Sequence, residues 1–204
     1  MLHSDNIPVL LLTGYLGSGK TTLLNRILSN RKGIRFAVIV NDIGEVNIDA
    51  ELIQKGGVVA QQDDSLIALQ NGCICCSLKM DLVQQLRDLC ATNQFDYIVI
   101  EASGICEPAP IAQTICSYPS MVPASAAPSP VLDAIVSVVD ALRLRNEFME
   151  QLSSISNNSL PIAKAEDLAS LVIEQIEFCN LILLNKVSEV NEEERKQIIS
   201  IIRA

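Results

Sequence analysis

Residues 14–21 have the types and spacing of a phosphate-binding loop. They read GYLGSGKT and fit the pattern G-x-x-x-x-G-K-[ST] without a mismatch. The backbone N–H groups of such a loop can wrap a pyrophosphate only if few side chains intrude, and its three glycines provide that room. A nucleotide-binding loop is therefore predicted here, with contacts from Gly14, Gly17, Ser18, Gly19, Lys20, Thr21 and Thr22.

Two side chains of this loop would act on the phosphates and on their counterion. Lys20 would place a positive charge on the β- and γ-phosphates, next to the positive end of the helix that follows. The Thr21 hydroxyl would ligate Mg²⁺. A chance glycine-rich turn is the alternative, but the loop follows an apolar strand and opens a helix, as the motif requires.

Glu101 ends the apolar run FDYIVIE and would lie at the carboxyl end of a neighbouring strand. Ligands of open parallel sheets bind at that edge, where the Glu101 carboxylate would face Thr21 and join it around Mg²⁺. Gly104 follows three residues later and would let the next loop swing towards a γ-phosphate. We therefore predict that Lys20, Glu101 and Gly104 form the catalytic part of the site. An exposed glutamate that simply ends a strand is the alternative.

A cluster of three cysteines could bind a soft metal ion. Cys73, Cys75 and Cys76 lie in NGCICCSLKMD, and in an extended segment the first two project to the same side. Three thiolates suit Zn²⁺ or Cu(I) far better than Mg²⁺ or Ca²⁺. Structural zinc has four closed ligands, so an incomplete set is what a site that passes its metal onward would need. Redox chemistry of the adjacent cysteines and plain burial are the alternatives.

Composition excludes several classes of protein and partner. The chain has 204 residues, a hydrophobic share of 49% and a formal net charge of −9, so a disordered chain is excluded and one domain over residues 1–204 is expected. The acidic balance disfavours a nucleic acid or an anionic membrane surface as partner. Seven cysteines, an odd number with three in four positions, indicate reduced thiols and a cytoplasmic protein.

Apolar runs alternate with helix-length segments along the chain. The runs are rich in Val and Ile and continuously apolar, as in strands that are covered on both faces. The predicted strands are Ile7–Thr13, Phe36–Asn41, Tyr97–Glu101, Ala134–Asp140 and Leu181–Asn185, with a short antiparallel excursion over Val58–Leu69. The predicted helices are Lys20–Ser29, Ser77–Ala91, Pro108–Ser117, Ala141–Leu152, Ala165–Gln175 and Glu192–Ala204. This alternation predicts an α/β fold with a mainly parallel sheet.

Taken together and in this order, the motifs resemble those of the CobW-like metallochaperone GTPases, which include the zinc-regulated GTPase metalloprotein activators. The matching stretches span about nine-tenths of the chain. They are GYLGSGKTT at 14–22, NDIGEVNID at 41–49, NGCICC at 71–76, EASGICEP at 101–108, SVVD at 137–140 and LLNK at 183–186.

The resemblance implies a P-loop NTPase (Ras-like) three-layer fold that binds GTP or GDP with Mg²⁺. It also implies a transition metal, Zn²⁺ or another such as Co²⁺, which the CxCC cysteines bind and deliver to a client metalloprotein. NDIGEVNID resembles the family's first switch, in which Glu45 would be a further metal ligand or a coupling residue. Asn185 and Lys186 match the base-recognition motif and would contact guanine.

The chain departs from the family pattern at three places. Ser188 stands where the guanine motif usually has Asp, and a hydroxyl pairs less well with the guanine edge, so ATP or relaxed selectivity stays open. Asp42 stands where the family usually has Glu. The C-terminal domain that family members carry after the GTPase domain is expected to be absent.

Two other functions remain as alternatives. One is a metal-sensing or storage module that turns nucleotide over slowly, and the other is a P-loop ATPase. The isoleucine-rich stretch at 198–202 also leaves a homo-oligomer open, because it would offer a partner surface.

Overall fold

A computed structural model of the protein describes residues 6–29, 33–41, 68–71, 79–123, 127–146 and 163–203. Within these ranges the chain forms one six-stranded sheet whose strand order is β3-β2-β4-β1-β5-β6. Every strand pairing in it is parallel. The strands are β1 (Asn6–Thr13), β2 (Phe36–Asn41), β3 (Ala68–Asn71), β4 (Tyr97–Glu101), β5 (Ser129–Asp140) and β6 (Leu181–Asn185).

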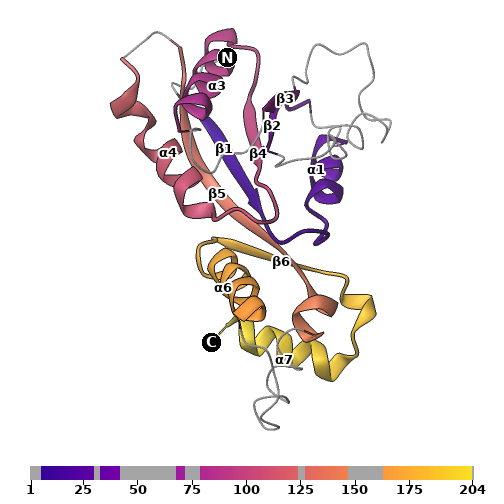
Figure 1. Ribbon diagram of the computed structural model, residues 1–204. Coiled ribbons are helices and arrows are strands. Elements are labelled where there is room, and N and C mark those ends of the chain that lie inside the picture. The colour runs from indigo at the N-terminus through magenta and orange to yellow at the C-terminus, as the bar shows by residue number, and fades with distance from the viewer. Residues whose placement is uncertain are drawn as a thin grey trace.

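Helices cover both faces of the sheet and give the molecule three layers (Figure 1). On one face α3 and α4 pack against alternate residues of β1 and β4, and on the other face α1 packs against the intervening residues. α6, α7 and the short helix at 141–146 pack with the carboxyl end of β5. The helices are α1 (Lys20–Leu28), α3 (Lys79–Thr92), α4 (Pro108–Met121), α6 (Ala163–Glu177), α7 (Glu192–Ile202), the 3₁₀ turn η1 (Val187–Glu189) and a short helix at 141–146.

Burial on both faces explains why the strands are continuously apolar. Along β1, Ile7, Val9 and Leu11 join the core under α3 and α4, whereas Leu12 joins the core under α1. Each of these four side chains is at most 4% exposed. A central strand of a parallel sheet therefore has no polar face, which is the pattern expected from the sequence.

All five predicted strands are present, and the fold class is confirmed as an α/β fold with a parallel sheet. β5 starts five residues earlier than predicted, at Ser129, where its first residues pair with the start of β1. The antiparallel excursion expected over Val58–Leu69 is wrong where it can be compared, because β3 begins at Ala68 and pairs in parallel with β2. Residues 58–67 lie outside the described residues. Among the described helices, none has the length and apolar character needed to span a membrane.

Candidate functional site

The loop between β1 and α1 is folded tightly enough to require glycine at two positions. Gly14 has φ of 131°, and a Cβ there would lie 2.2 Å from the carbonyl oxygen of Val138 in β5. Gly19 has φ of 107°, and its Cβ would lie 2.3 Å from the side-chain nitrogen of Asn185. Larger residues at either position would meet both backbone strain and a collision. Close contacts with β5 and with the Asn185 side chain of β6 therefore fix the shape of the loop.

The start of α1 is suited to bind an anion. Gly19 is its N-cap and supplies no side-chain hydrogen bond, and the first turn as described contains no acidic residue. The Lys20 ammonium lies inside the loop, where its Nζ donates to the carbonyl oxygens of Gly14 at 2.8 Å and Tyr15 at 3.3 Å. The N-terminus of a helix and a buried ammonium thus both lie at this loop, and such groups are the donors that bind phosphate.

Thr21 and Glu101 meet across the loop, although 80 residues separate them in the chain. The Thr21 hydroxyl donates to Oε1 of Glu101 at 2.9 Å, and Glu101 is only 2% exposed at the end of β4. The alternative of an exposed, strand-ending glutamate is therefore wrong. A hydroxyl and a carboxylate are the hard oxygen donors that Mg²⁺ prefers, so the donor set fits that ion. Their role as magnesium ligands remains a prediction.

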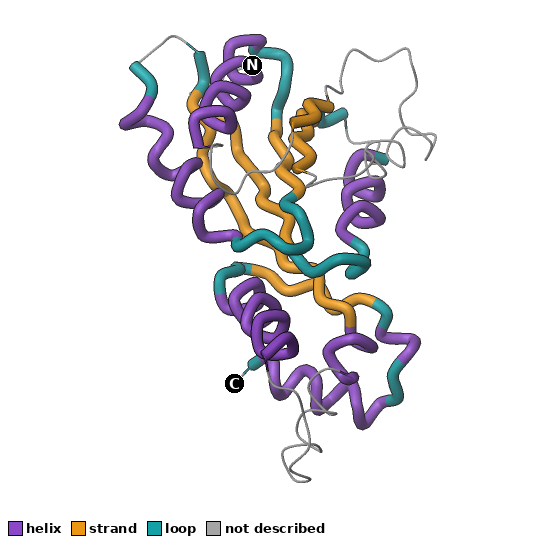
Figure 2. Tube along the Cα trace, in the orientation of Figure 1, coloured by secondary structure: helices purple, strands orange, loops and turns teal. Residues whose placement is uncertain are grey.

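The turn after Glu101 lies directly against the phosphate-binding loop (Figure 2). The Cys106 N–H donates to the carbonyl oxygen of Ser103 at 3.0 Å and closes the turn. At Gly104 an added Cβ would lie 2.5 Å from the backbone nitrogen of Leu16. The residue predicted to approach the γ-phosphate is therefore in contact with the loop predicted to hold the phosphates.

Asn185 and Lys186, predicted to contact guanine, make protein contacts in the structure. Asn185 Nδ2 donates to the backbone oxygen of Ser18 in the loop at 2.8 Å. Lys186 has φ of 55° and its Nζ pairs with Asp140 Oδ2 at 2.5 Å. Asn185 ends β6 and Lys186 follows it, at the edge of the sheet where the loop lies, so both are placed beside the site. Contact with a base remains a prediction, as does the effect of Ser188, which lies in η1.

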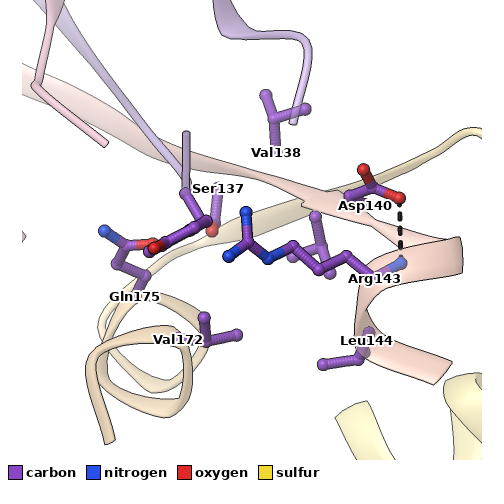
Figure 3. Close-up of a pocket in the computed structure, with 9 residues that line it drawn as sticks. Ser137, Val138, Asp140, Arg143, Leu144, Val172 and Gln175 are labelled. Carbon is purple, nitrogen blue, oxygen red and sulfur yellow. Dashed lines mark hydrogen bonds between the residues drawn. The ribbon is translucent and has the colours of Figure 1, made fainter. Parts of the chain in front are cut away.

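Arg143 also contacts the phosphate-binding loop, and the sequence analysis did not anticipate it. Its guanidinium carbon lies 3.8 Å from the centre of the Tyr15 ring, and its NH1 donates to the backbone oxygen of Leu16 at 3.4 Å. Asp140 accepts a hydrogen bond from the Arg143 N–H at 3.1 Å and so caps the helix at 141–146 (Figure 3). An Asp directly before a helix was a readable capping signal, whereas no sequence pattern marked the arginine.

A small cavity lies behind the loop, between β5 and α6 (Figure 3). Its volume is about 20 Å³, which is room for about one water and far too little for a nucleotide. Ser137 lines it, and within the described part of the chain the Ser137 hydroxyl has no hydrogen-bond partner. Gln175 of α6 lines the same cavity and reaches towards the turn after Glu101.

The predicted transition-metal ligands cannot be placed. Cys73, Cys75, Cys76 and Glu45 lie outside the described residues. Among the residues that are described, no three His, Cys, Asp or Glu side chains are grouped to hold a metal ion. Thr22, predicted as a nucleotide contact, is exposed in the first turn of α1. The CxCC site therefore remains a prediction from the sequence.

Comparison with known protein families identifies the chain. Residues 8–204 match the family model of the CobW/HypB/UreG, nucleotide-binding domain. The chain belongs to this family. The family consists of P-loop GTPases, in agreement with the loop at 14–21 and the parallel sheet.

Three similar proteins place the chain within the family. It is 38% identical over 208 residues to the zinc-regulated GTPase metalloprotein activator 1 of Dictyostelium discoideum, covering 98% of this chain and 44% of the relative. It is 31% identical to the zinc chaperone CobW of Pseudomonas aeruginosa, covering 92% and 50%. The crystal structure of Zn(II)-bound YjiA GTPase from E. coli matches with a TM-score of 0.57 and 28% identity, covering 95% and 54%. The chain thus spans about half the length of these relatives.

Proposed function

We propose that the chain binds and hydrolyses GTP in the cytoplasm and uses this cycle to deliver a transition metal, Zn²⁺, to a client metalloprotein. The observation that carries the nucleotide half of the proposal is the contact between Thr21 and Glu101 across the phosphate-binding loop. In a chance glycine-rich turn there would be no reason for the Thr21 hydroxyl to meet the buried carboxylate of Glu101 from another strand. The names of the relatives from Dictyostelium discoideum and Pseudomonas aeruginosa support the zinc half.

Each part of the nucleotide site has a task in this proposal. The N–H groups of residues 17–21 and the Lys20 ammonium would bind the β- and γ-phosphates, because they already lie at the loop. Thr21 and Glu101 would hold Mg²⁺, which neutralises charge that develops on the phosphate oxygens. Gly104 would let the turn at 103–106 approach the γ-phosphate. Asn185 and Lys186 would contact guanine, and Asn185 would also hold the loop in shape through its hydrogen bond to Ser18.

Zinc is the cargo in this proposal and not a resident cofactor. Cys73, Cys75 and Cys76 would bind it as thiolates, with Glu45 of the first switch as a further ligand that senses the nucleotide. Co²⁺ is the alternative cargo. A switch that orders around the γ-phosphate and relaxes after hydrolysis would change the ligand set and release the ion to the client.

The deciding experiment measures Zn²⁺ affinity by chelator competition in three states. The protein is titrated free, with Mg–GDP, and with a non-hydrolysable Mg–GTP analogue. We expect at least a tenfold difference between the two nucleotide states, which equals about 1.4 kcal/mol of coupling. Equal affinities in all three states would refute nucleotide-gated delivery within this chain and favour a metal-sensing or storage module.

A matched pair of cysteine variants tests the metal ligands. Cys75→Ser should lose tight Zn²⁺ binding and keep nucleotide binding. Cys116→Ser is the control, since Cys116 is exposed on α4 and has no part in the proposal. Competition between GTP and ATP for the same protein tests base selectivity, and stronger binding of ATP would favour the ATPase alternative that Ser188 leaves open.

A further inference from the structure

Gln175 is a buried amide that connects α6 to the turn after Glu101. Its side chain is in the core, with the residue 2% exposed. Its Nε2 lies 3.2 Å from the backbone oxygen of Cys106 and 3.4 Å from the backbone oxygen of Gly104. Carbonyl oxygens only accept hydrogen bonds, so the amide must present its NH₂ group to both. The two N–H bonds of one side chain are therefore directed at two carbonyl groups of the same turn.

Packing alone gives no reason for an amide at this position. A buried polar group costs free energy unless it is hydrogen-bonded, and an apolar residue of similar size would fill the same space. Val172, one turn earlier on α6, shows what packing does select on this face of the helix. It is 7% exposed and joins Val139 in the core between α6 and β5. Gln175 thus departs from the apolar pattern of its own face.

The turn that Gln175 holds lies at the γ-phosphate end of the proposed site. It starts two residues after Glu101, whose carboxylate meets Thr21. Within the turn, Gly104 is pressed against the backbone of Leu16 in the phosphate-binding loop. Any drift of the turn away from α6 would change the spacing between Gly104 and Leu16.

A second amide from the same part of the chain holds the other side of the site. α6 leads into β6, and Asn185 at the end of β6 donates to Ser18 in the phosphate-binding loop at 2.8 Å. The α6–β6 unit therefore contacts both loops that would enclose the phosphates. Gln175 holds the turn, and Asn185 holds the loop.

We propose that Gln175 is a positioning residue, which fixes the turn at 103–106 against the phosphate-binding loop and thereby sets γ-phosphate recognition and the hydrolysis rate. This inference rests on the proposed function, because that proposal places the turn at the γ-phosphate. It requires that binding of GDP, which has no γ-phosphate, depends little on Gln175. It also requires that the turn loosens without Gln175 even when no nucleotide is present.

The test compares Gln175→Met with Val172→Ala. Methionine keeps the length and bulk of glutamine and removes both donors, whereas Val172→Ala weakens the packing of α6 and leaves the amide in place. Hydrogen exchange of the 102–107 backbone in nucleotide-free protein reports the turn directly. For Gln175→Met we expect roughly tenfold faster exchange there, the range for the loss of one or two buried hydrogen bonds. We expect no such local change for Val172→Ala.

Nucleotide measurements on the same variants test the link to the reaction. For Gln175→Met, kcat for GTP should fall about tenfold with KM changed less than threefold, and the affinity for a GTP analogue should fall relative to that for GDP. Val172→Ala should keep the wild-type kcat and the wild-type affinity ratio, although its melting temperature is lower. Equal losses in the two variants would overturn the proposal, because they would show a general effect of weaker α6 packing.

The outcomes separate this inference from the proposed function. Wild-type exchange at 102–107 in Gln175→Met overturns the positioning role, whatever the wild-type protein does with GTP. A wild-type protein that neither binds nor hydrolyses GTP refutes the proposed function and with it the catalytic part of the inference, even if exchange is faster in the variant. Faster exchange together with the loss of kcat and of γ-phosphate preference supports both.

Discussion

Replacing Gly104 by alanine should separate nucleotide binding from hydrolysis. The new Cβ would lie 2.5 Å from the backbone nitrogen of Leu16 and 2.8 Å from its Cα, whereas ordinary contacts begin near 3.4 Å. The phosphate-binding loop is held by Asn185 and by the close packing of Gly14 on Val138, so we expect the turn to move, at the expense of its hydrogen bonds with Gln175. A shift of roughly 1 Å restores normal contact, and a misplacement of about 1 Å can lower a rate on the order of a hundredfold.

Three measurements check this expectation. Single-turnover hydrolysis of GTP with Mg²⁺ should slow about a hundredfold in Gly104→Ala. The affinity for fluorescent GDP should stay within about threefold, because the contacts of the β-phosphate come from the loop and not from the turn. Thermal unfolding should show that the variant is folded, which separates a misplaced turn from a lost structure.

Gly33→Ala is the matched control for this substitution. Gly33 has φ of 73°, so alanine there is strained, but no described atom lies within 4 Å of the added Cβ. It should cost about 1–2 kcal/mol of stability and leave the hydrolysis rate unchanged. A wild-type rate in Gly104→Ala would refute the reasoning, because it would mean that the spacing between the turn and Leu16 does not govern the chemistry.

Three further substitutions or modifications follow from contacts in the structure. Asn185→Ala removes the hydrogen bond that holds the phosphate-binding loop, so GDP affinity by fluorescence titration should fall about fivefold to tenfold; an unchanged affinity would contradict this role. Burial raises the pKa of Cys90 to about 11, so iodoacetamide at pH 8 should modify the exposed Cys116 first, and equal labelling of the two in mass spectra would argue against that burial. The side-chain hydrogen bond from Arg35 lowers the pKa of Asp96. Arg35→Met should therefore lose a small stabilisation of the folded protein. In the wild type this stabilisation is fully present above the pKa of an unfolded Asp, about 3.9. It disappears as the pH falls through the lowered pKa of Asp96. Urea unfolding of the wild type and of Arg35→Met across this pH range measures the difference in their free energies of unfolding. A difference that grows towards low pH would contradict the prediction.

The fold could be predicted from the sequence because burial leaves a strong pattern there. Strands covered on both faces, such as β1 and β4, must be apolar along most of their length, and β-branched residues mark them. The contact between Thr21 and Glu101 was also predictable. Parallel strands put their carboxyl ends at one edge of the sheet, so a carboxylate that ends one strand lies near the loop that ends its neighbour.

The residues that support the site could not be predicted in the same way. Gln175 and Arg143 act through backbone carbonyls of distant loops, and a carbonyl has no residue type that a sequence pattern could reveal. The motif at Asn185 predicts a contact with guanine, which stays a prediction, but it gave no sign of the hydrogen bond that the Asn185 amide makes to the backbone of Ser18. Such contacts depend on which loops the finished sheet brings together, so they become visible only with the coordinates.

The place of β1 in the sheet has a consequence for synthesis. β1 is synthesised about 90 residues before its partner β4 and about 120 residues before its partner β5, and such distant pairings form slowly. Asn185, which braces the loop after β1, is made later still. The nascent chain must therefore keep a very apolar strand from aggregating until most of the domain has been translated. If the chain binds GTP as proposed, the nucleotide would not protect this early intermediate, because Asn185, which ends the last of the described strands, would not yet be there to hold the loop for its phosphates.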